Sequence, residues 1–321
     1  MSDETIEKTF QVTAPARLII SNVRGSVTIQ AGEAGVIEVK AIKHGNFENG
    51  SCVIEMTQDT GGSVRVETRS NESLFGFLSH PPKVEYTVRV PQGIHLEASC
   101  VSSTLNVSGL EGVFKLKTIS GDVELANLTG PFKLKAVSGD ISGSHLAGVL
   151  ELGTVSGRVR LEASSFPNAD ASTVSGDLVL QTPIAGGPYY FSSVSGSVRL
   201  LVPPDTHCNA ELNSVSGSIR SSLPATTTHM GHGLKVTQVG SGGTAVRLKS
   251  VSGSLSFEVE GVPASNVPVT TTYPAVPVPP MPPTSPVASA TAPLSTAEIL
   301  QRIERGEMTV DEAIKLMKDQ S

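Results

Sequence analysis

Residues 114–141 read FKLKTISGDVELANLTGPFKLKAVSGDI, in which an apolar residue followed by Ser-Gly-Asp occurs twice, eighteen residues apart. The apolar-Ser-Gly motif recurs along the chain, and its apolar positions are Ile119, Val137, Val155, Val174, Val194, Val215 and Val251. From Ser102 to Ser216, successive serines are separated by 18, 18, 18, 19, 20 and 21 residues. A degenerate copy, Val239-Gly240-Ser241, divides the last interval. A period this regular indicates a repeat architecture.

Apolar and polar residues alternate on both sides of each motif, as in Phe114-x-Leu116-x-Thr118 and Val123-x-Leu125. This alternation predicts two short strands per unit, joined at a corner by Ser-Gly, where glycine is expected to adopt a positive φ. A third apolar position in each unit is expected to face the interior. Its occupants are Leu110, Leu128, Leu146 and Phe166. One unit cannot bury its apolar face alone, so stacking at about 4.8 Å per turn predicts an all-β fold, a β-solenoid of ~18-residue repeats.

Composition and pattern divide the chain into five parts. Before the solenoid, Leu18 to Ile29 aligns with Phe114 to Leu125 at lower fidelity, and further strands are expected at 36–42, 53–56, 64–68 and 84–90. Ten prolines between Pro263 and Pro293 favour an extended spacer. The expected parts are an N-terminal tail (1–9), an irregular β region capping the solenoid (10–92), the β-solenoid (93–261), a Pro-rich disordered linker (262–294) and a helical hairpin (295–321).

The C-terminal hairpin is predicted from two capping boxes, Ser295 to Glu298 and Thr309 to Glu312, with Gly306 as a stop between them. Two helices of roughly ten residues are expected from these signals. The apolar residues that can face one another are Ile299, Leu300 and Ile303 on the first helix and Ala313, Ile314 and Met317 on the second. Because 27 residues rarely fold alone, we expect 295–321 to self-associate or to bind a protein partner.

The charge and composition of the chain exclude several classes of protein. It carries 24 basic and 30 acidic residues, no Trp, and 13 Phe plus Tyr, so neither a phosphate-tracking surface nor a set of base-stacking platforms is expected. We therefore expect no nucleic-acid partner. No cationic segment followed by an apolar run opens the chain, and no apolar run reaches the roughly 18 residues of a membrane span. These features, with isolated Cys52, Cys100 and Cys208, predict a cytoplasmic protein with reduced, mostly buried thiols.

Two groups of residues suggest chemistry. Asp122, Asp140 and Asp177 take equivalent corner positions. Carboxylates clustered on one face of a β-helix are what a calcium-dependent lyase or a glycosidase would use. Arg158 interrupts the column, which favours ordinary turn residues. His229 and His232 lack the further ligands that a structural zinc site needs. No catalytic, metal or cofactor residue is predicted.

Insertions gather after the second strand of the later units, at 164–168, 183–190, 203–208 and 222–233. Insertions at one corner of a solenoid often form its binding face. Tyr190 aligns with outward Lys115, so we hypothesise that it contacts a partner. The alternative is a set of ordinary loops, with Tyr189 in the core. An outward stripe of mixed charge is expected at Glu97, Lys115, Lys133, Glu151 and Asp170.

The Val-Ser-Gly-Asp repeat, from about residue 10 to 260, resembles the bacterial “putative adhesin” family of unknown function, which is similar to the β-helical adhesin-head GIN domains. This resemblance implies a right-handed solenoid. The pattern Ile299-Leu300-x-x-Ile303-Glu304-x-Gly306 and the residues after it look like the SHOCT-type helical hairpins found beside such domains. Together the resemblances imply a non-enzymatic binding protein linked to the cell surface or envelope.

Three functions follow from these observations. The first is an intracellular interaction scaffold, in which 295–321 self-associates or docks while the solenoid offers a rigid surface to a protein or, peripherally, to an envelope component. The second is an exported adhesin that binds a glycan or a host surface. The third, a β-helical enzyme acting on polysaccharides, is disfavoured because the sequence shows no convergent acid/base pair.

Overall fold

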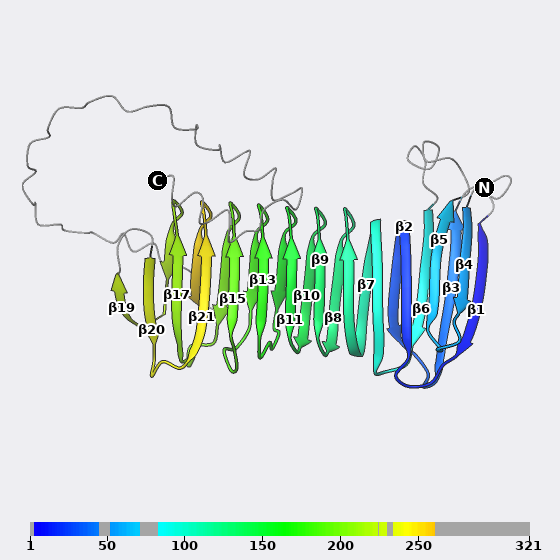
Figure 1. Cartoon of the computed structure of the whole chain (residues 1–321), viewed down its shortest axis with the longest axis horizontal. Coiled ribbons are helices and arrows are strands. Elements are labelled where there is room, and N and C mark those ends of the chain that lie inside the picture. The colour runs from blue at the N-terminus through cyan, green and yellow to red at the C-terminus, as the bar shows by residue number, and fades with distance from the viewer. Residues whose placement is uncertain (1–2, 45–51, 71–82, 224, 230–233, 261–321) are drawn as a thin grey trace, which may run out of the picture.

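The protein is described by a computed structural model over residues 3–44, 52–70, 83–223, 225–229 and 234–260. These residues form twenty-two strands and no helix, arranged along one long axis (Figure 1). The N-terminal strands are β1 (Glu4–Gln11), β2 (Arg17–Ala31), β3 (Val36–His44), β4 (Cys52–Gln58), β5 (Val64–Ser70), β6 (Lys83–Val90) and β7 (Ile94–Thr118). The middle strands are β8 (Val123–Thr129), β9 (Phe132–Ala136), β10 (Ile141–Ala147), β11 (Leu150–Thr154), β12 (Val159–Glu162), β13 (Ala169–Thr173), β14 (Leu178–Gln181), β15 (Tyr189–Ser193) and β16 (Val198–Val202). The last strands are β17 (Cys208–Ser214), β18 (Ile219–Ser221), β19 (Ala225–His229), β20 (Leu234–Val239), β21 (Thr244–Ser250) and β22 (Leu255–Val259).

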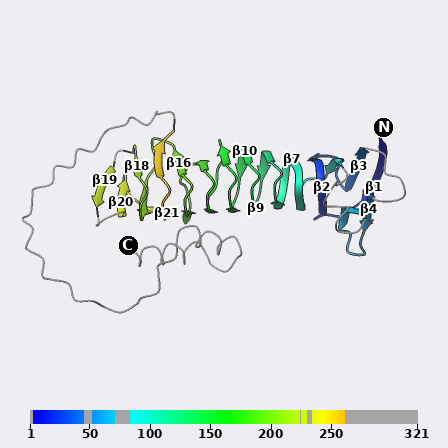
Figure 2. The same ribbon diagram turned by 90° about the horizontal axis from the view of Figure 1, so that it is seen from above.

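Over the described residues, the prediction of an all-β fold built from repeated, stacked strands is confirmed. Each turn adds one strand to each of two parallel ladders, β9–β11–β13–β15 and β8–β10–β12–β14–β16. Figure 2 shows these strands from above, following one another along the long axis. Neighbouring strands are shifted by one repeat, so Leu116 lies beside Leu134, which lies beside Leu152. The predicted linker (262–294) and helical hairpin (295–321) lie outside the described residues.

The interior is filled by the alternate residues that the period of two predicts. Phe114, Leu116, Val123 and Leu125 are all buried. The predicted third-side residues Leu110, Leu128, Leu146 and Phe166 are buried as well. The Phe114 and Phe132 rings stack with centroids 5.2 Å apart, so aromatic contacts also pass from one turn to the next.

The corners are held by backbone contacts between successive turns. The Ser138 N–H donates to the carbonyl oxygen of Ile119 at 2.8 Å, and the same bond recurs at later corners. A Cβ on Gly139 would lie 2.0 Å from the carbonyl oxygen of Gly121. The expected positive φ at the corner glycines is wrong, since none of them adopts one. Glycine is required because the backbones of adjacent turns approach too closely for any side chain.

The order of the turns in space differs from their order in the sequence. β15 pairs with β21 rather than β17, and β16 pairs with β22 rather than β18. β17 and β18 lie beyond this inserted turn, on the far side of β21 and β22. The expected solenoid copy at 239–241 is also wrong, because β20 runs antiparallel to β17 and ends the parallel stack. Part of the expected insertion at 222–233 is β19, which pairs with β20.

Antiparallel strands also close the N-terminal end. β2 pairs in parallel with residues 95–108 of β7, and on its other side with β5 and β6. β3 runs antiparallel to β6, β1 to β3, and β4 to β5. The strands expected at 36–42, 53–56, 64–68 and 84–90 coincide with β3, β4, β5 and β6. The expected tail, residues 1–9, instead overlaps β1, because Ile6 and Phe10 pack against the core.

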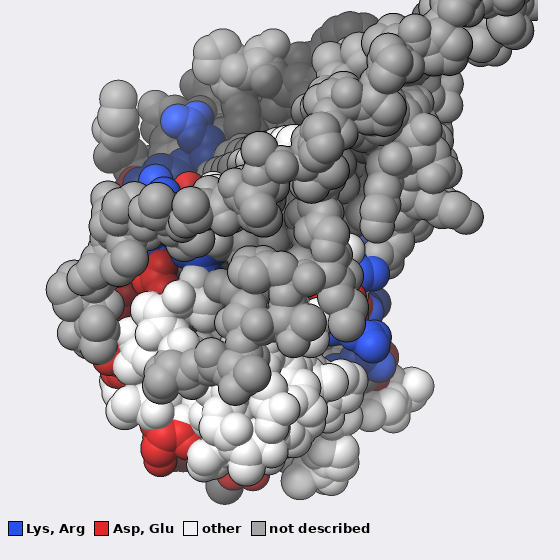
Figure 3. All heavy atoms as spheres, turned by 90° about the vertical axis from the view of Figure 1, so that its left-hand side faces the viewer, with Lys and Arg blue, Asp and Glu red and all other residues white. Residues whose placement is uncertain are grey.

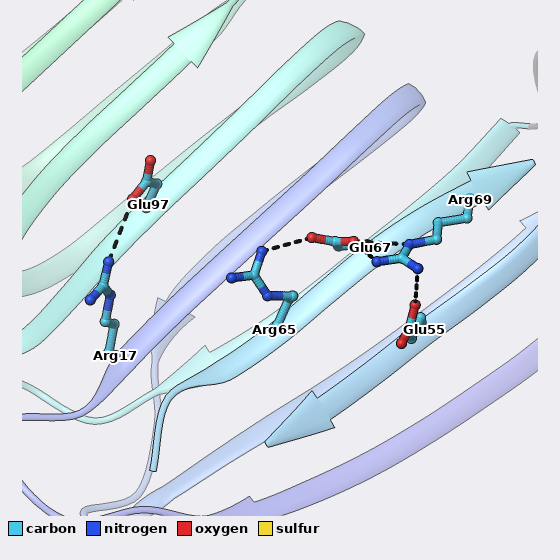
Figure 4. A network of polar contacts seen from close by, with 6 residues as sticks. All are labelled: Arg17, Glu55, Arg65, Glu67, Arg69 and Glu97. Atoms are coloured by element: carbon cyan, nitrogen blue, oxygen red, sulfur yellow. Dashed lines mark hydrogen bonds and ion pairs between the residues drawn. The ribbon is translucent and has the colours of Figure 1, made fainter. Parts of the chain in front are cut away.

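An ion-pair network ties β4 to β5 on the outside of this end (Figure 4). Glu55 and Glu67 face each other across the two strands, which would be repulsive without a cation. Arg69 contacts Glu55 at 3.0 Å and Glu67 at 2.9 Å, and Arg65 contacts Glu67 at 2.9 Å. Hydrogen bonds from Arg65 and Arg69 lower the pKa of Glu67.

Candidate interaction surface

The apolar residue of every motif, together with Val101 of the related Val101-Ser102-Ser103 one turn earlier, points away from the core; these residues form a continuous line, here called the corner column. In spatial order its members are Val101, Ile119, Val137, Val155, Val174, Val194, Val251 and Val215. Val101, Ile119 and Val137 have exposed fractions of 38%, 49% and 46%. Large exposed apolar side chains in a row on a rigid scaffold are typical of a contact surface.

A shallow groove of ≈ 440 Å³ runs beside the exposed part of the column. Its floor is the outer face of β9, β11 and β13, and Gly153 deepens it by presenting no side chain. Ile119, Val137, Val155 and Val174 form its apolar edge. The groove can therefore accommodate an apolar side chain or a short segment of another chain.

The far end of the corner column is covered. Val174, Val194 and Val251 have exposed fractions of 5%, 0% and 0%, although they take the same outward position as Ile119 and Val137. None of the three belongs to the cluster of residues that fills the interior. Ser192, which also points outward beside Val194, is only 3% exposed.

The charged side chains that line the groove are positive, and one of them, Lys117, also contacts Glu97 at 3.9 Å outside the lining. Lys117 and Lys135 line the groove, and the described lining contains no carboxylate. In the predicted mixed-charge stripe, Lys115 contacts Glu97 at 2.8 Å and lowers the pKa of that carboxyl, and Lys133 pairs with Glu151. Seen from the β19–β20 end, the described surface between the grey atoms is largely uncharged, with charged side chains toward its sides (Figure 3).

The predicted contact residue Tyr190 lies on β15, half-buried and in register with Asp170 and Arg247. Its ring has the Lys249 ammonium 5.3 Å from the centroid. Tyr189 is buried, and its hydroxyl donates to the Phe166 carbonyl oxygen at 2.6 Å. The structure thus separates the two tyrosines as the alternation predicts, and partner contact by Tyr190 stays a prediction.

The corner aspartates act on the neighbouring turn. Asp122 accepts a hydrogen bond from the Asp140 N–H at 3.1 Å, and Asp140 accepts one from the Arg158 N–H at 2.7 Å. Asp177 accepts one from the Ser197 N–H at 3.2 Å. A carboxylate that accepts a hydrogen bond from a backbone N–H of the next turn stabilises the stack, which accounts for the position of these aspartates.

The remaining candidates are the cysteines and the histidines. Cys100 and Cys208 are free and buried, and burial raises their pKa to about 12 and about 11. Three potential metal ligands do not come together among the described residues. The described side chains do not include those of His229 and His232, nor that of Cys52.

The predicted partner-binding residues of the hairpin, Ile299, Leu300, Ile303, Ile314 and Met317, lie outside the described residues. The corner column itself was not predicted as a site, because its residues were used only as markers of the repeat. A signal was available in the sequence. The alternation that buries Leu116 and Thr118 places Ile119 on the outward side. The residue at this outward position is nevertheless apolar in every copy of the motif.

Comparison with known proteins agrees with this architecture. The Toastrack DUF4097 family profile matches residues 16–258. The chain belongs to this family. The match includes all of β2 and extends to the penultimate residue of β22, so it covers nearly all of the described Toastrack domain. The described Toastrack residues include no helix of the length and hydropathy required to cross a membrane.

Two solved structures resemble the Toastrack chain. One is a “putative cell adhesion protein” from Clostridium sporogenes, with 11% identity, a TM-score of 0.27, and coverage of 80% of this chain and 100% of that one. The other is a “putative lipid binding protein” from Parabacteroides distasonis, with 12% identity, a TM-score of 0.40, and coverage of 80% and 96%. No curated protein matches the sequence.

Proposed function

We propose that this Toastrack protein is a non-enzymatic interaction scaffold that binds a protein partner along the exposed part of the corner column. The observation that carries the proposal is the row formed by Val101, Ile119 and Val137, each exposed by more than a third on a rigid stack. Binding a partner there would remove apolar surface from water at little conformational cost, because the strands that hold the column are already ordered.

The groove favours a partner with an apolar segment flanked by acidic residues. Ile119, Val137 and Val155 supply apolar contacts. Lys135 and Lys117 line the strand side, where the described lining has no carboxylate, although Lys117 also contacts Glu97 at 3.9 Å outside it. Positive charge at the rim would select the orientation and the identity of the partner more than it would raise affinity.

The test compares two variants with matched exposure. Full-length Ile119→Ser/Val137→Ser should capture its specific partner from host lysate about tenfold less well than the wild type, as expected when central apolar contacts are lost. The control is Val113→Ser/Val149→Ser, whose valines are 40% and 48% exposed but lie outside the column. Quantitative mass spectrometry gives the readout. Equal capture by both variants would reject the corner column as the binding surface.

The location of the protein is part of the proposal. We place it in the cytoplasm, with a SHOCT-like hairpin at 295–321 that docks or self-associates and a peripheral envelope contact. Two free, buried thiols support a reducing compartment. Cell fractionation with protease treatment of intact cells tests this location. Removal of the protein from the cell surface would favour the GIN-like adhesin alternative.

The absence of enzyme activity is also proposed and has a direct test. The corner carboxylates Asp122, Asp140 and Asp177 each accept a backbone hydrogen bond, which is the support for a structural role. Incubation with a panel of polysaccharides should release no reducing ends and no unsaturated sugars. Turnover of any one of them that is lost on Asp140→Asn would overturn the proposal.

A further inference from the structure

The burial at the far end of the corner column is not explained by packing in the interior. Val174, Val194 and Val251 occupy three successive turns and are nearly inaccessible, while their counterparts Ile119 and Val137 are half exposed. All three lie outside the interior cluster, so the core is not what buries them. Their burial extends to Ser192 on the outer face of β15.

We propose that residues 295–321 of the same chain dock in cis on Val174, Val194 and Val251. This intramolecular site adjoins the exposed part of the column, where we place the partner, and Val174 also lines the end of the groove. The inference does not require a partner, because the three valines are covered in the protein alone. It assigns the C-terminal segment to one place on the solenoid.

The dimensions of the segment fit those three turns. Each of its predicted helices has roughly ten residues and would be about 15 Å long. Three turns of a β stack span about 14 Å at ~4.8 Å each. A helix lying along the column would advance ~5.4 Å per turn, so one apolar residue per helical turn, such as Ile299 and Ile303, can meet one valine per β turn.

The connection between the two parts also fits. The described chain ends at Glu260, after β22, and Val251 lies at the corner that precedes the same strand. Residues 261–294 supply 34 residues, which reach about 105 Å if extended as polyproline II. The way back to Val251 is about the length of β22, roughly 17 Å. A tether of this kind holds the segment at an effective concentration near the millimolar range, which favours docking in cis.

Hydrogen exchange on the purified full-length protein tests the inference. A 27-residue segment is marginal in isolation, so its amides should exchange at least about tenfold slower than those of an unstructured chain only if it is docked. The variant Val174→Asp/Val194→Asp should lose this protection. The control Ile119→Asp/Val137→Asp changes the same corner position two or more turns away and should keep it.

A reciprocal experiment changes the C-terminal segment instead of the column, so its result does not depend on whether the column variant folds. In full-length Ile299→Asp/Ile303→Asp the solenoid is untouched, and hydroxyl-radical oxidation of Val174, Val194 and Val251 should rise several-fold while that of Ile119 stays constant. Unprotected amides at 295–321 in the wild type would overturn the inference. So would equal protection in both column variants, or unchanged oxidation of the three valines.

Dilution separates docking in cis from docking on a second copy. Protection of 295–321 should not change when the protein is diluted a hundredfold and sediments as a monomer. Protection that disappears on dilution would assign the site to a second copy and overturn docking in cis. All these measurements use the protein alone, so a failure of the proposed partner binding leaves their outcome intact.

Discussion

The corner glycine shows how one residue type can be required for a reason that a sequence pattern does not reveal. The pattern suggested a left-handed backbone, whereas the structure shows a column of close carbonyl contacts. Gly139 and Gly157 each leave room for the carbonyl oxygen of the preceding corner, 2.0 Å from where a Cβ would lie. Repetition of the same approach at the seven Ser-Gly corners explains why the motif tolerates Asp, Arg or Ser after glycine but keeps the glycine in all seven copies; only the turn of Val101 has Ser103 instead.

Gly139→Ala should therefore lower the free energy of unfolding by about 3 kcal/mol, as expected for a methyl forced against backbone. The matched control is Gly153→Ala on β11, where the nearest atom to a new Cβ is the Ser172 Oγ at 3.7 Å. The control should change stability by less than about 1 kcal/mol. Urea unfolding of both variants gives the measurement, and similar losses in the two would contradict the close-contact explanation.

The two described cysteines should be inert in the folded protein. Burial raises the pKa of Cys100 to about 12 and that of Cys208 to about 11, so almost no thiolate exists near pH 8. In a Cys52→Ser background, thiol labelling at pH 8 should be at least about a hundredfold slower in the native state than in urea. Rapid native labelling of either thiol would show that the interior opens more readily than the packing implies.

At the scale of the element, the outer face of the β4–β5 hairpin depends on charge more than on packing. Glu55 and Glu67 lie opposite each other, and Arg69 bridges them (Figure 4). Such an exposed network contributes through several simultaneous contacts rather than through any one pair. Its contribution should therefore respond to pH and to salt.

The pKa of Glu67 is lowered from 4.5 in the folded state, chiefly by hydrogen bonds from Arg65 and Arg69. A lowered folded pKa means that the stabilisation is complete above pH 4.5 and is lost as the pH falls through the folded value. Glu67→Gln should thus reduce the stability at pH 7 and flatten the loss between pH 5 and pH 3. Urea midpoints at both pH values, at low and high salt, provide the measurement. An unchanged pH dependence would show that protonation of Glu67 is not coupled to the stability of the fold.

At the scale of the whole molecule, the C-terminal turn is placed out of order. The turn of β21 and β22 lies between those of β15–β16 and β17–β18, so the chain leaves one position open and returns to fill it. The antiparallel strands β19 and β20 make this return possible. The same device closes the other end through β1, β3 and β4, and both ends are thereby less open to further parallel growth.

Engineered disulfides can test this order. Ser195 and Ser252 lie on adjacent turns, where a spacing of about 4.8 Å suits a disulfide, whereas Ser195 and Ser216 are two turns apart at about 9.6 Å. In a Cys52→Ser background, the pair Ser195→Cys/Ser252→Cys should form a disulfide on mild oxidation, and Ser195→Cys/Ser216→Cys should not. Peptide mapping without reduction distinguishes the two. The reverse result would show that the turns stack in the order in which they occur in the sequence.

The sequence by itself determined the repeat, the two strands per turn, the inward face and the corner positions, because burial in a stacked β fold imposes a period of two within each turn and a period of one turn between them. Leu116 and Leu128 could be assigned to the interior on that basis alone. Only the tertiary structure decided which turn lies beside which, since the turns are nearly equivalent and any of them can stack on another. It also decided that Ile119 is exposed while Val194 is covered, because identical motifs differ only in what packs against them.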